Sequence, residues 1–425
     1  MSEELRNKFK KRSKDFTRSC LLSFPILVTF ILNLIRRSLQ MELNNFIKIL
    51  PSKRISKQTF SAARKKLLPE VFIELNKTLI QEFYTDNEFK TLFNRRVIVV
   101  DGSTLQLPTN DDIIKKYGIC KNQTTRVPMA RISYAYDVLN DITLDAIIGP
   151  FNESERKMAI QHVKNIDLEN HSEIKDLYIE DRGYPSTSLF FFYDHLKKEF
   201  IIRCKIKFSF EISDIVKKGC KEEIINWSTQ KISSKQKAEL QKIIPAIDFN
   251  KIIQLRVLVI PLNSGEKEVL ITNLLDKEKF KYKDFADFYF QRWKAEENYK
   301  FHKVRLEIEN FSGESTIAVK QDFHATIFTC NIRSMLANEA EEELRKKNSN
   351  KTLKYEYKIN KNISTGILKD EIIKVLLKKN SNLKKFCNRL KKQMKLSMVP
   401  IIPGRKYSRR KKSIKKYFIN IRRAL

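Results

Sequence analysis

Apolar residues between positions 284 and 313 recur with the period of a helix. At about 100° per residue, Phe285, Tyr289 and Trp293 lie on one face. The opposite face carries polar residues, as the solvent side of an amphipathic helix does, namely Asp284, Asp287, Gln291, Lys294 and Asn298. Arg292, Glu296 and Lys303 share the apolar side with Tyr289, within a sector of roughly 60°. Since charges on a buried face are costly unless paired or bound to an ion, the segment predicts either a paired structural network or a functional site.

Strand-like and helix-like patterns alternate between residues 96 and 207. Apolar, β-branched runs predict strands at 96–100, 130–139, 142–148, 176–180 and 200–207, and helical periods predict helices at 153–166 and after Pro185. The run at 96–100 is nearly all apolar, which is typical of a strand covered on both faces. We predict that it ends in Asp101 and that the fourth strand ends in Asp181. Considered alone, Asp101 is better explained as a turn residue with Gly102, and Asp181 could be a turn residue or a partner for Arg182.

This order of elements is that of the ribonuclease-H-like fold. We therefore expect an α/β catalytic core with a mixed five-stranded sheet flanked by helices. In that fold the carboxylates of Asp101, Asp181 and Glu296 meet at one edge of the sheet.

The remaining segments predict further domains. Residues 1–90 are mostly helical, the core takes 91–207 and 276–345, and residues 346–425 form a helical, basic C-terminal region. Asp181 and Glu296 are separated by many more residues than the about 40 that a helix, a strand and two loops need. We expect the surplus, residues 208–275, to be a β-rich insertion that contains Trp227 as a core tryptophan.

Two N-terminal segments each allow more than one interpretation. The apolar stretch 21–35 is shorter than the about 20 residues needed to span a bilayer, and we interpret it as a buried helix. A helix that begins after Ser56 carries Lys57, Arg64, Lys65 and Lys66. Such a helix could enter a DNA major groove, or it could pack as a basic amphipathic helix on its neighbours, and the sequence favours neither.

Composition narrows the chemistry. The 425 residues carry a net charge of +33, which indicates a polyanionic partner, most often nucleic acid, although a merely solvated basic surface has the same signature. Cysteines and histidines are scattered, which argues for a reducing compartment and against a zinc site. Carboxylates remain as candidate ligands, and they suit Mg²⁺ or Mn²⁺. The sequence has no glycine-rich phosphate loop, so an ATP-driven motor is not expected.

The motifs resemble one family. Tyr289-x2-Arg292-x3-Glu296-x6-Lys303 resembles the signature of DDE transposases of the insertion-sequence type-four (IS-four) family, and VDGSTLQLP at 100–108 and DRGYPS at 181–186 resemble its two aspartate motifs. The resemblance spans roughly residues 20–420. It implies that Asp101, Asp181 and Glu296 are catalytic and bind two Mg²⁺ (or Mn²⁺) ions, and that Tyr289, Arg292 and Lys303 hold DNA phosphate.

The resemblance also implies an activity and partners. The activity is cut-and-paste transposition, with cleavage and strand transfer at terminal inverted repeats of double-stranded DNA. The protein would act as a homodimer in the DNA complex, at the nucleoid in the prokaryotic cytoplasm, with no membrane partner. It places recognition of the transposon ends in residues 1–90, and in relatives an aromatic residue of the insertion stacks on a flipped base. The alternatives are a metal-dependent nuclease of the same fold that only hydrolyses, and a non-catalytic DNA-binding derivative.

Overall fold

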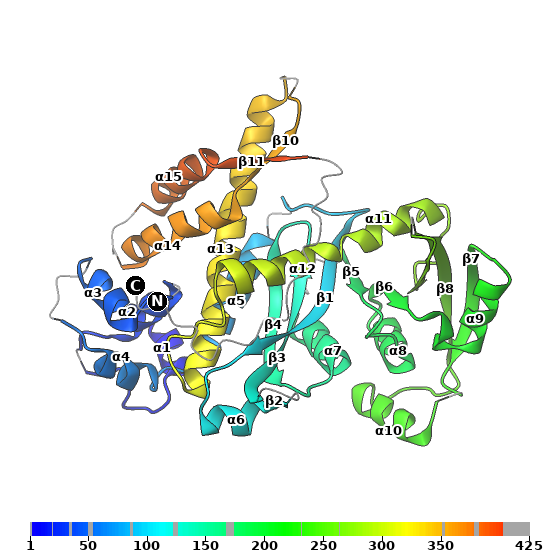
Figure 1. Cartoon of the computed structure of the whole chain (residues 1–425), viewed down its shortest axis with the longest axis horizontal. Helices are drawn as coiled ribbons and strands as arrows, with labels where there is room; N and C mark the ends of the chain where they lie inside the picture. Colours follow the sequence, from blue (N-terminus) through cyan, green and yellow to red (C-terminus); the bar gives the residue numbers. More distant parts are fainter. Residues whose placement is uncertain are drawn as a thin grey trace.

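The chain folds into a mixed sheet with helices on both faces and a helical region at one end (Figure 1). The structure is a computed structural model and describes residues 2–402 except 19, 34–35, 50–53, 86–87, 122–125, 167–173, 231, 263, 351–352 and 378–381. The basic block at 404–425, which from its sequence could contact the DNA backbone or be a solvated tail, lies outside the described residues.

The five predicted strands and their intervening helices occur in the expected order. The strands are β1 (Arg95–Gln106), β3 (Arg126–Asp137), β4 (Ile142–Pro150), β5 (Lys175–Glu180) and β6 (Glu199–Cys204), and the helices are α7 (Glu155–Asn165) and α8 (Thr187–His195). Before β3 the chain adds α6 (Asp111–Tyr117) and the short β2 (Ile119–Lys121). β3 is antiparallel to β1 and to β4, whereas β5 is parallel to β1 and to β6.

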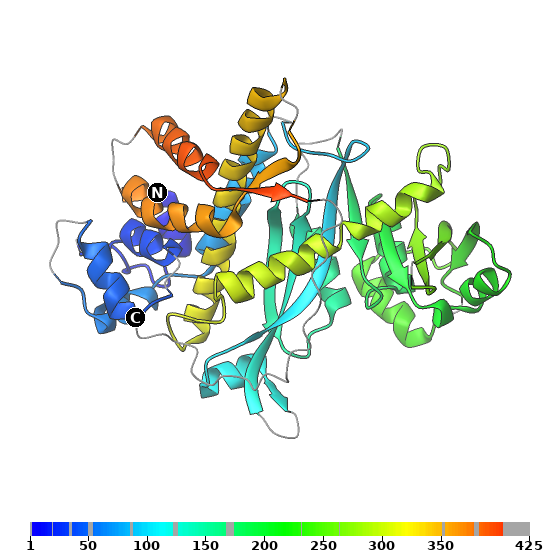
Figure 2. The same ribbon diagram turned by 45° about the horizontal axis from the view of Figure 1, so that its top comes forward.

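The sheet is larger than the five strands predicted. Within the described residues it has nine strands: β2 pairs with β3, and β9 (Lys267–Thr272) pairs antiparallel with the otherwise free edge of β6. β9 pairs in turn with β8 (Ile252–Pro261), and β8 pairs with β7 (Glu222–Ser228). Helices α9 (Phe210–Lys217) and α10 (Ser234–Ile243) complete this part of the chain. Segment 208–275 therefore extends the sheet sideways (Figure 2).

Both faces of the central strands are covered, which explains their apolar sequence. Ile98 and Val100 belong to a core shared with α7 and α8. Val97 and Val99 point to the other face, into a core shared with α11 (Phe285–Phe290) and α12 (Trp293–Lys300). By the same alternation, Asp101 projects toward α11 and α12.

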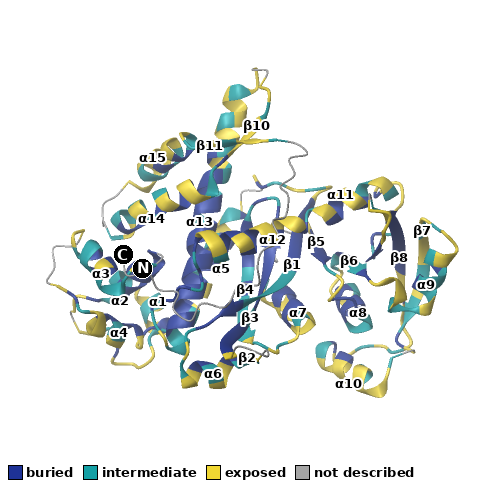
Figure 3. Cartoon of the chain, in the orientation of Figure 1, coloured by how far each residue is buried: buried dark blue, intermediate teal, exposed yellow. Residues whose placement is uncertain are grey.

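The N-terminal and C-terminal helices share one core around the long helix α13 (Figure 3). The N-terminal helices are α1 (Glu3–Phe9), α2 (Phe24–Leu32), α3 (Leu39–Ile47), α4 (Lys57–Arg64) and α5 (Glu70–Phe83). The C-terminal elements are α13 (Thr316–Asn348), β10 (Glu356–Ile359), α14 (Lys361–Leu377), α15 (Leu383–Lys395) and β11 (Met398–Ile401). Most of α2 is buried, as predicted for the apolar stretch. Within the described part of the chain, no helix has the length and apolarity to cross a membrane.

The first predicted strand continues past the position where we expected it to end. Asp101 lies in the middle of β1, because residues up to Gln106 stay paired with β3 after the pairing with β5 has stopped. Asp181 does follow the last residue of β5, as predicted.

The predicted helix at 284–313 is tightened in one place and widened in another. Bonds from Gln291 N–H to Phe288 O and from Arg292 N–H to Tyr289 O span only three residues, so a tight turn joins α11 to α12. After Lys300 the helix widens into a π turn, Phe301–Arg305. The tight turn comes before Trp293 and Asn298 and exchanges their predicted environments: Trp293 is exposed and Asn298 is buried.

Candidate active site

Asp101 and Asp181 lie side by side at the sheet edge. The parallel ladder between β1 and β5 ends with Val100 opposite Glu180, and each aspartate is the next residue along the chain. Neighbouring strands lie about 4.8 Å apart, so the register alone brings the two residues together. Both side chains point toward α11 and α12, since Tyr289 of α11 bonds Asp181 and Arg292 lies near Asp101.

The helix side of the site is held by side-chain contacts. The Tyr289 hydroxyl donates to Asp181 Oδ1 at 3.0 Å. Arg292 Nη2 donates to Glu296 Oε1 at 2.8 Å, and Arg292 Nη1 lies 4.0 Å from Asp101 Oδ2. Arg292 is buried, whereas 42% of the Glu296 side chain is exposed. Arg292 therefore bridges two of the three predicted acids.

Two further contacts fix the same stretch of β1. Lys303 Nζ donates to Ser103 Oγ at 2.8 Å, and the Tyr299 hydroxyl donates to the main-chain oxygen of Asp101 at 2.6 Å. Lys303 reaches β1 from the π turn. The structure thus places all six sequence-predicted residues at one edge, with Asp101, Asp181, Tyr289, Arg292, Glu296 and Lys303 on the α11–α12 side.

The charges at this edge influence one another. Burial raises the pKa of Asp101 to about 7, and the nearby carboxylates of Glu296 and Asp181 contribute to this rise, against the lowering effect of Arg292. Burial also lowers the pKa of Lys303. Negative charge on Asp101 is therefore costly here unless a cation compensates it.

The donor set fits a hard divalent cation, although it is not a compact cage. Three carboxylates that repel one another are the oxygen ligands that Mg²⁺ and Mn²⁺ prefer. Among the described residues, however, no group of three or more His, Cys, Asp or Glu side chains is close enough to hold a metal ion. Arg292 lies between Asp101 and Glu296, so it would have to give way as the acids close on a cation.

Arg203 is a site residue that the sequence reasoning missed. It lies in β6, and its Nη1 is 3.9 Å from Asp181 Oδ1 while its Nε is 3.2 Å from Glu268. The available signal was a single cation inside the apolar run of β6. Arg203 lines a cavity of about 530 Å³ together with Tyr289, Arg292 and the exposed aromatic side chain of Phe290.

Gly102 permits a close approach from the opposite face. A Cβ atom on Gly102 would lie 2.7 Å from Glu155 Oε1, and one on Gly183 would lie 3.4 Å from Glu155 Oε2. Glu155 forms an ion pair with Arg131 at 2.8 Å. The carboxylate at the start of α7 therefore contacts the residue after Asp101 and lies close to the Asp181 loop, and no local pattern in the sequence indicated this.

The structure shows the surroundings of Trp227, for which the sequence allowed a core position or a role in base stacking. Trp227 packs on Phe208, with ring centroids 5.9 Å apart, and donates through Nε1 to Thr187 at 3.2 Å. It is half-buried against the core, and it also lines a cavity of about 340 Å³.

The structure also bears on the basic helix α4, which from its sequence could enter a DNA groove or pack on its neighbours. In α4, Lys57 and the following Lys65 are exposed, but Arg64 is buried and pairs with Asp322 at 2.8 Å. Arg64 therefore does not belong to a surface that could read DNA.

Comparison with known proteins identifies the class. Residues 92–332 match the family described as the transposase DDE domain, which is more than half of the chain. The chain belongs to this family, and the family supports the function of a DDE transposase.

The other comparisons are weaker. Among solved structures, the cryo-EM structure of a piggyBac transposase synaptic complex with hairpin DNA resembles this chain at 9% identity, over 90% of this chain and 76% of that chain, with a TM-score of 0.41. No curated protein matches the sequence.

Proposed function

We propose that the protein is a cut-and-paste transposase of the IS-four type, which cleaves DNA at the terminal inverted repeats of an insertion sequence and joins the freed ends to a target. The observation that carries this proposal is the convergence of the Tyr289–Lys303 signature on the aspartate pair. The strand order β4-β3-β1-β5-β6, with β5 parallel to both β1 and β6, supports a ribonuclease-H-like core.

In this proposal Asp101, Asp181 and Glu296 hold two Mg²⁺ or Mn²⁺ ions. Bound there, the ions would activate the attacking oxygen and stabilise the leaving oxygen of a phosphoryl transfer. The protein's own part is to keep Asp101 and Asp181 adjacent through the sheet and to bring Glu296 in on a helix. Burial of Asp101 also strengthens the attraction of its carboxylate for a cation.

Tyr289, Arg292 and Lys303 are proposed to hold the DNA phosphate beside these acids. The Nε of Arg292 is buried and has no hydrogen-bond partner within the described residues, so a phosphate oxygen would satisfy an otherwise costly donor. Arg binds phosphate as a two-pronged fork, and Lys binds it as a point charge. The net charge of +33 supports a nucleic-acid substrate, and the resemblance makes this double-stranded DNA.

We assign the predicted domains the following parts in this activity. Residues 1–90 recognise the transposon ends, and the core at 91–207 and 276–345 carries the chemistry. Two protomers hold the two ends in one complex. Exposed Lys57 and Lys65, on and beside α4, are cations in the described N-terminal region that suit DNA contact.

The testing experiment incubates the full-length protein with a duplex that carries the terminal repeats of its own element, with Mg²⁺ or with EDTA. Wild type is compared with Asp101→Asn, Glu296→Gln and the matched neighbour Glu297→Gln, whose side chain is exposed. We expect metal-dependent breaks at the repeat boundary in wild type and Glu297→Gln only. Breaks that persist in Glu296→Gln would show that the three-acid assignment is wrong.

The products separate this function from the two alternatives. Joining of the cleaved ends to a second duplex supports a transposase, whereas hydrolysis without joining supports a nuclease of the same fold. Binding without breaks in every variant supports the non-catalytic derivative.

A further inference from the structure

A chain of buried polar side chains reaches Asp101 from the face opposite α12. Asp145 of β4 lies 2.7 Å from His162 Nδ1, and His162 Nε2 lies 2.9 Å from Ser133 Oγ. Ser133 Oγ then donates to the main-chain oxygen of Asp101 at 3.1 Å. His162 and Ser133 are both fully buried.

This Asp–His–Ser chain has the residue types of a hydrolase triad, but it cannot do that chemistry. A nucleophilic serine must present its oxygen to a substrate. Ser133 is inside the sheet, and its hydroxyl is directed at a main-chain carbonyl. What the chain can do is orient the group at its inner end.

The inner end is the main chain of Asp101, which is held from both sides of the sheet. Tyr299 bonds the same carbonyl oxygen from the α12 side at 2.6 Å, and Ser133 bonds it from the α7 side. Two donors on one carbonyl oxygen restrict rotation of the peptide group between Asp101 and Gly102. These two hydrogen bonds would therefore fix the position from which the Asp101 side chain projects.

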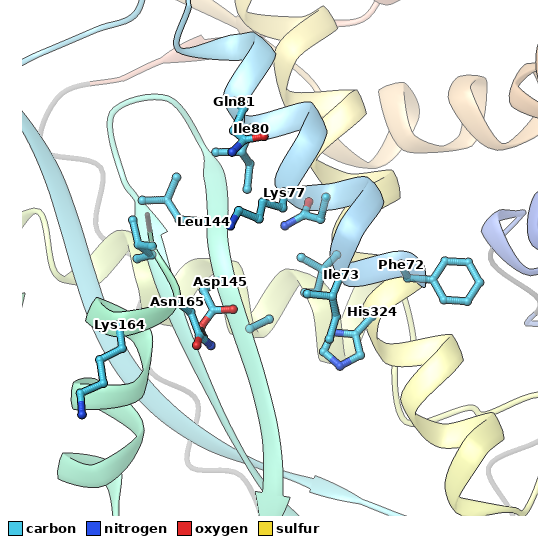
Figure 4. A pocket seen from close by; sticks show the side chains of 14 residues that line it. Phe72, Ile73, Lys77, Ile80, Gln81, Leu144, Asp145, Lys164, Asn165 and His324 are labelled. Atoms are coloured by element: carbon cyan, nitrogen blue, oxygen red, sulfur yellow. Dashed lines mark hydrogen bonds between the residues drawn. The ribbon is translucent and has the colours of Figure 1, made fainter. Parts of the chain in front are cut away.

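The outer end is anchored at a cavity wall. Asp145 and Asn165 lie together on the wall of a cavity of about 440 Å³ (Figure 4). Asn165 Nδ2 donates to Asp145 Oδ2 at 3.0 Å, the oxygen that also faces His162. Burial would raise the pKa of Asp145, but the hydrogen bond and charge of His162, with Asn165, hold it below its ordinary value. Asp145 is therefore a fixed acceptor that sets the ring orientation of His162.

We infer that Asp145, His162 and Ser133 form a positioning relay that aims the Asp101 carboxylate for cation binding. This inference rests on the proposed function, because it assumes that Asp101 is a metal ligand. Partners behind a metal ligand typically change metal affinity or activity by about 10–100-fold when they are removed.

The test uses two replacements of His162 that differ only in which ring nitrogen they imitate. In His162→Asn the new amide would lie near the former Nδ1 and keep the bond to Asp145, so this variant cuts the link to Ser133. In His162→Gln the longer amide reaches the former Nε2 position, so this variant keeps that link. Ser133→Ala removes the last step, and Ser364→Ala is the matched control, because Ser364 is also buried and bonds the main-chain oxygen of Lys361.

Two readouts are taken on the full-length protein. The first is Mn²⁺ binding without DNA, followed by electron paramagnetic resonance, with Asp101→Asn as reference. The second is the Mg²⁺ concentration that gives half-maximal nicking of the terminal-repeat duplex. We expect Ser133→Ala and His162→Asn to weaken both by about 10-fold, His162→Gln to be affected less, and Ser364→Ala to match wild type.

The outcomes separate the relay from the proposed function. Normal Mn²⁺ affinity and normal Mg²⁺ dependence in Ser133→Ala overturn the relay and leave the transposase assignment standing. Equal losses in His162→Asn, His162→Gln and Ser364→Ala also overturn it, because they indicate a general packing defect. Mn²⁺ binding that weakens in the expected order, in a protein that never nicks DNA, supports the relay and refutes the proposed function alone. If Asp101→Asn leaves Mn²⁺ binding unchanged, the relay has no metal ligand to position and is refuted.

Discussion

Arg64 connects α4 to α13, and its replacement gives a prediction that can be worked out from the structure. Its guanidinium pairs with Asp322 at 2.8 Å and donates to Gln321 at 2.9 Å and to Ser312 at 2.8 Å. The Arg64 and Asp322 side chains are only 4% and 3% exposed. Arg64→Met therefore removes one partner of a buried ion pair and strands buried polar groups.

Removing one partner of a buried pair costs about 3–5 kcal/mol. Asp322 keeps the N–H of Ser312 at 2.7 Å and its hydroxyl at 2.9 Å, so part of its charge stays compensated. We therefore expect the lower limit, about 3 kcal/mol in the free energy of unfolding, which is on the order of a hundredfold in the folding equilibrium.

Urea unfolding of Arg64→Met measures this cost, with Lys65→Met as the control, because Lys65 is the exposed neighbour. The same two variants are tested for binding to the terminal-repeat duplex. An unfolding midpoint equal to that of the control, together with weakened DNA binding by Arg64→Met alone, would refute the reasoning. It would then favour Arg64 as a groove-reading residue.

Two further predictions concern the catalytic edge and the β3–β4 hairpin. Tyr289→Phe removes the 3.0 Å bond to Asp181, and because hydrogen bonds to charged groups are worth about 1.5–3 kcal/mol, nicking should slow by about 10–100-fold; an unchanged nicking rate would contradict this role. Asp141 is buried, which would raise its pKa, but Lys361 and Arg333 together hold that pKa far below its ordinary value. A depressed carboxylate pKa stabilises the fold above the unfolded-state pKa, so this contribution should be full at neutral pH and decrease progressively as the pH falls below about 4 toward the folded-state pKa. Thermal unfolding of Asp141→Asn should accordingly show a deficit at pH 7 that shrinks toward pH of about 3, and a deficit independent of pH would contradict the assignment.

The central strands could be predicted from the sequence because burial on both faces leaves a local trace. Val97 to Val100 are apolar without alternation, and both faces are indeed covered. The placement of Asp181 after β5 also followed from local pattern. The extension of β1 beyond Asp101 did not, because it depends on pairing with β3, a contact between residues distant in sequence.

The signature helix shows a similar division. Its apolar period correctly placed Phe285 and Tyr289 inside. It misplaced Trp293 and Asn298, because a tight turn between α11 and α12 rotates the faces of α12 relative to those of α11. No residue type in the sequence predicts this turn. The contact of Glu155 with Gly102 could not be predicted either, since a glycine in a strand can reflect a bulge, a bend or a close approach by another group.

The terminal helical regions could not be joined by local reasoning. Phe30 and Phe60 share a core with Leu336, Leu390 and Met394, which lie more than 270 positions later in the chain. Deleting residues 1–90 would expose that core. A truncated protein that loses preference for terminal repeats would therefore not separate recognition from folding, and substitutions at exposed Lys57 and Lys65 are the cleaner test.

The parallel register of β1 and β5 has a consequence for how the site tolerates inserted residues. The offset between Asp101 and Asp181 is set by main-chain pairing, so lengthening the connection between these strands leaves the two acids where they are. The position of Glu296 is not set by main-chain pairing, because Glu296 lies on a helix that is held to the sheet by side-chain hydrogen bonds. One residue inserted between Tyr289 and Glu296 would rotate the acid by about 100° away from its partners. The number of residues within the signature is thus fixed by the geometry of the site, whereas the long segments between the motifs can be lengthened without moving the acids.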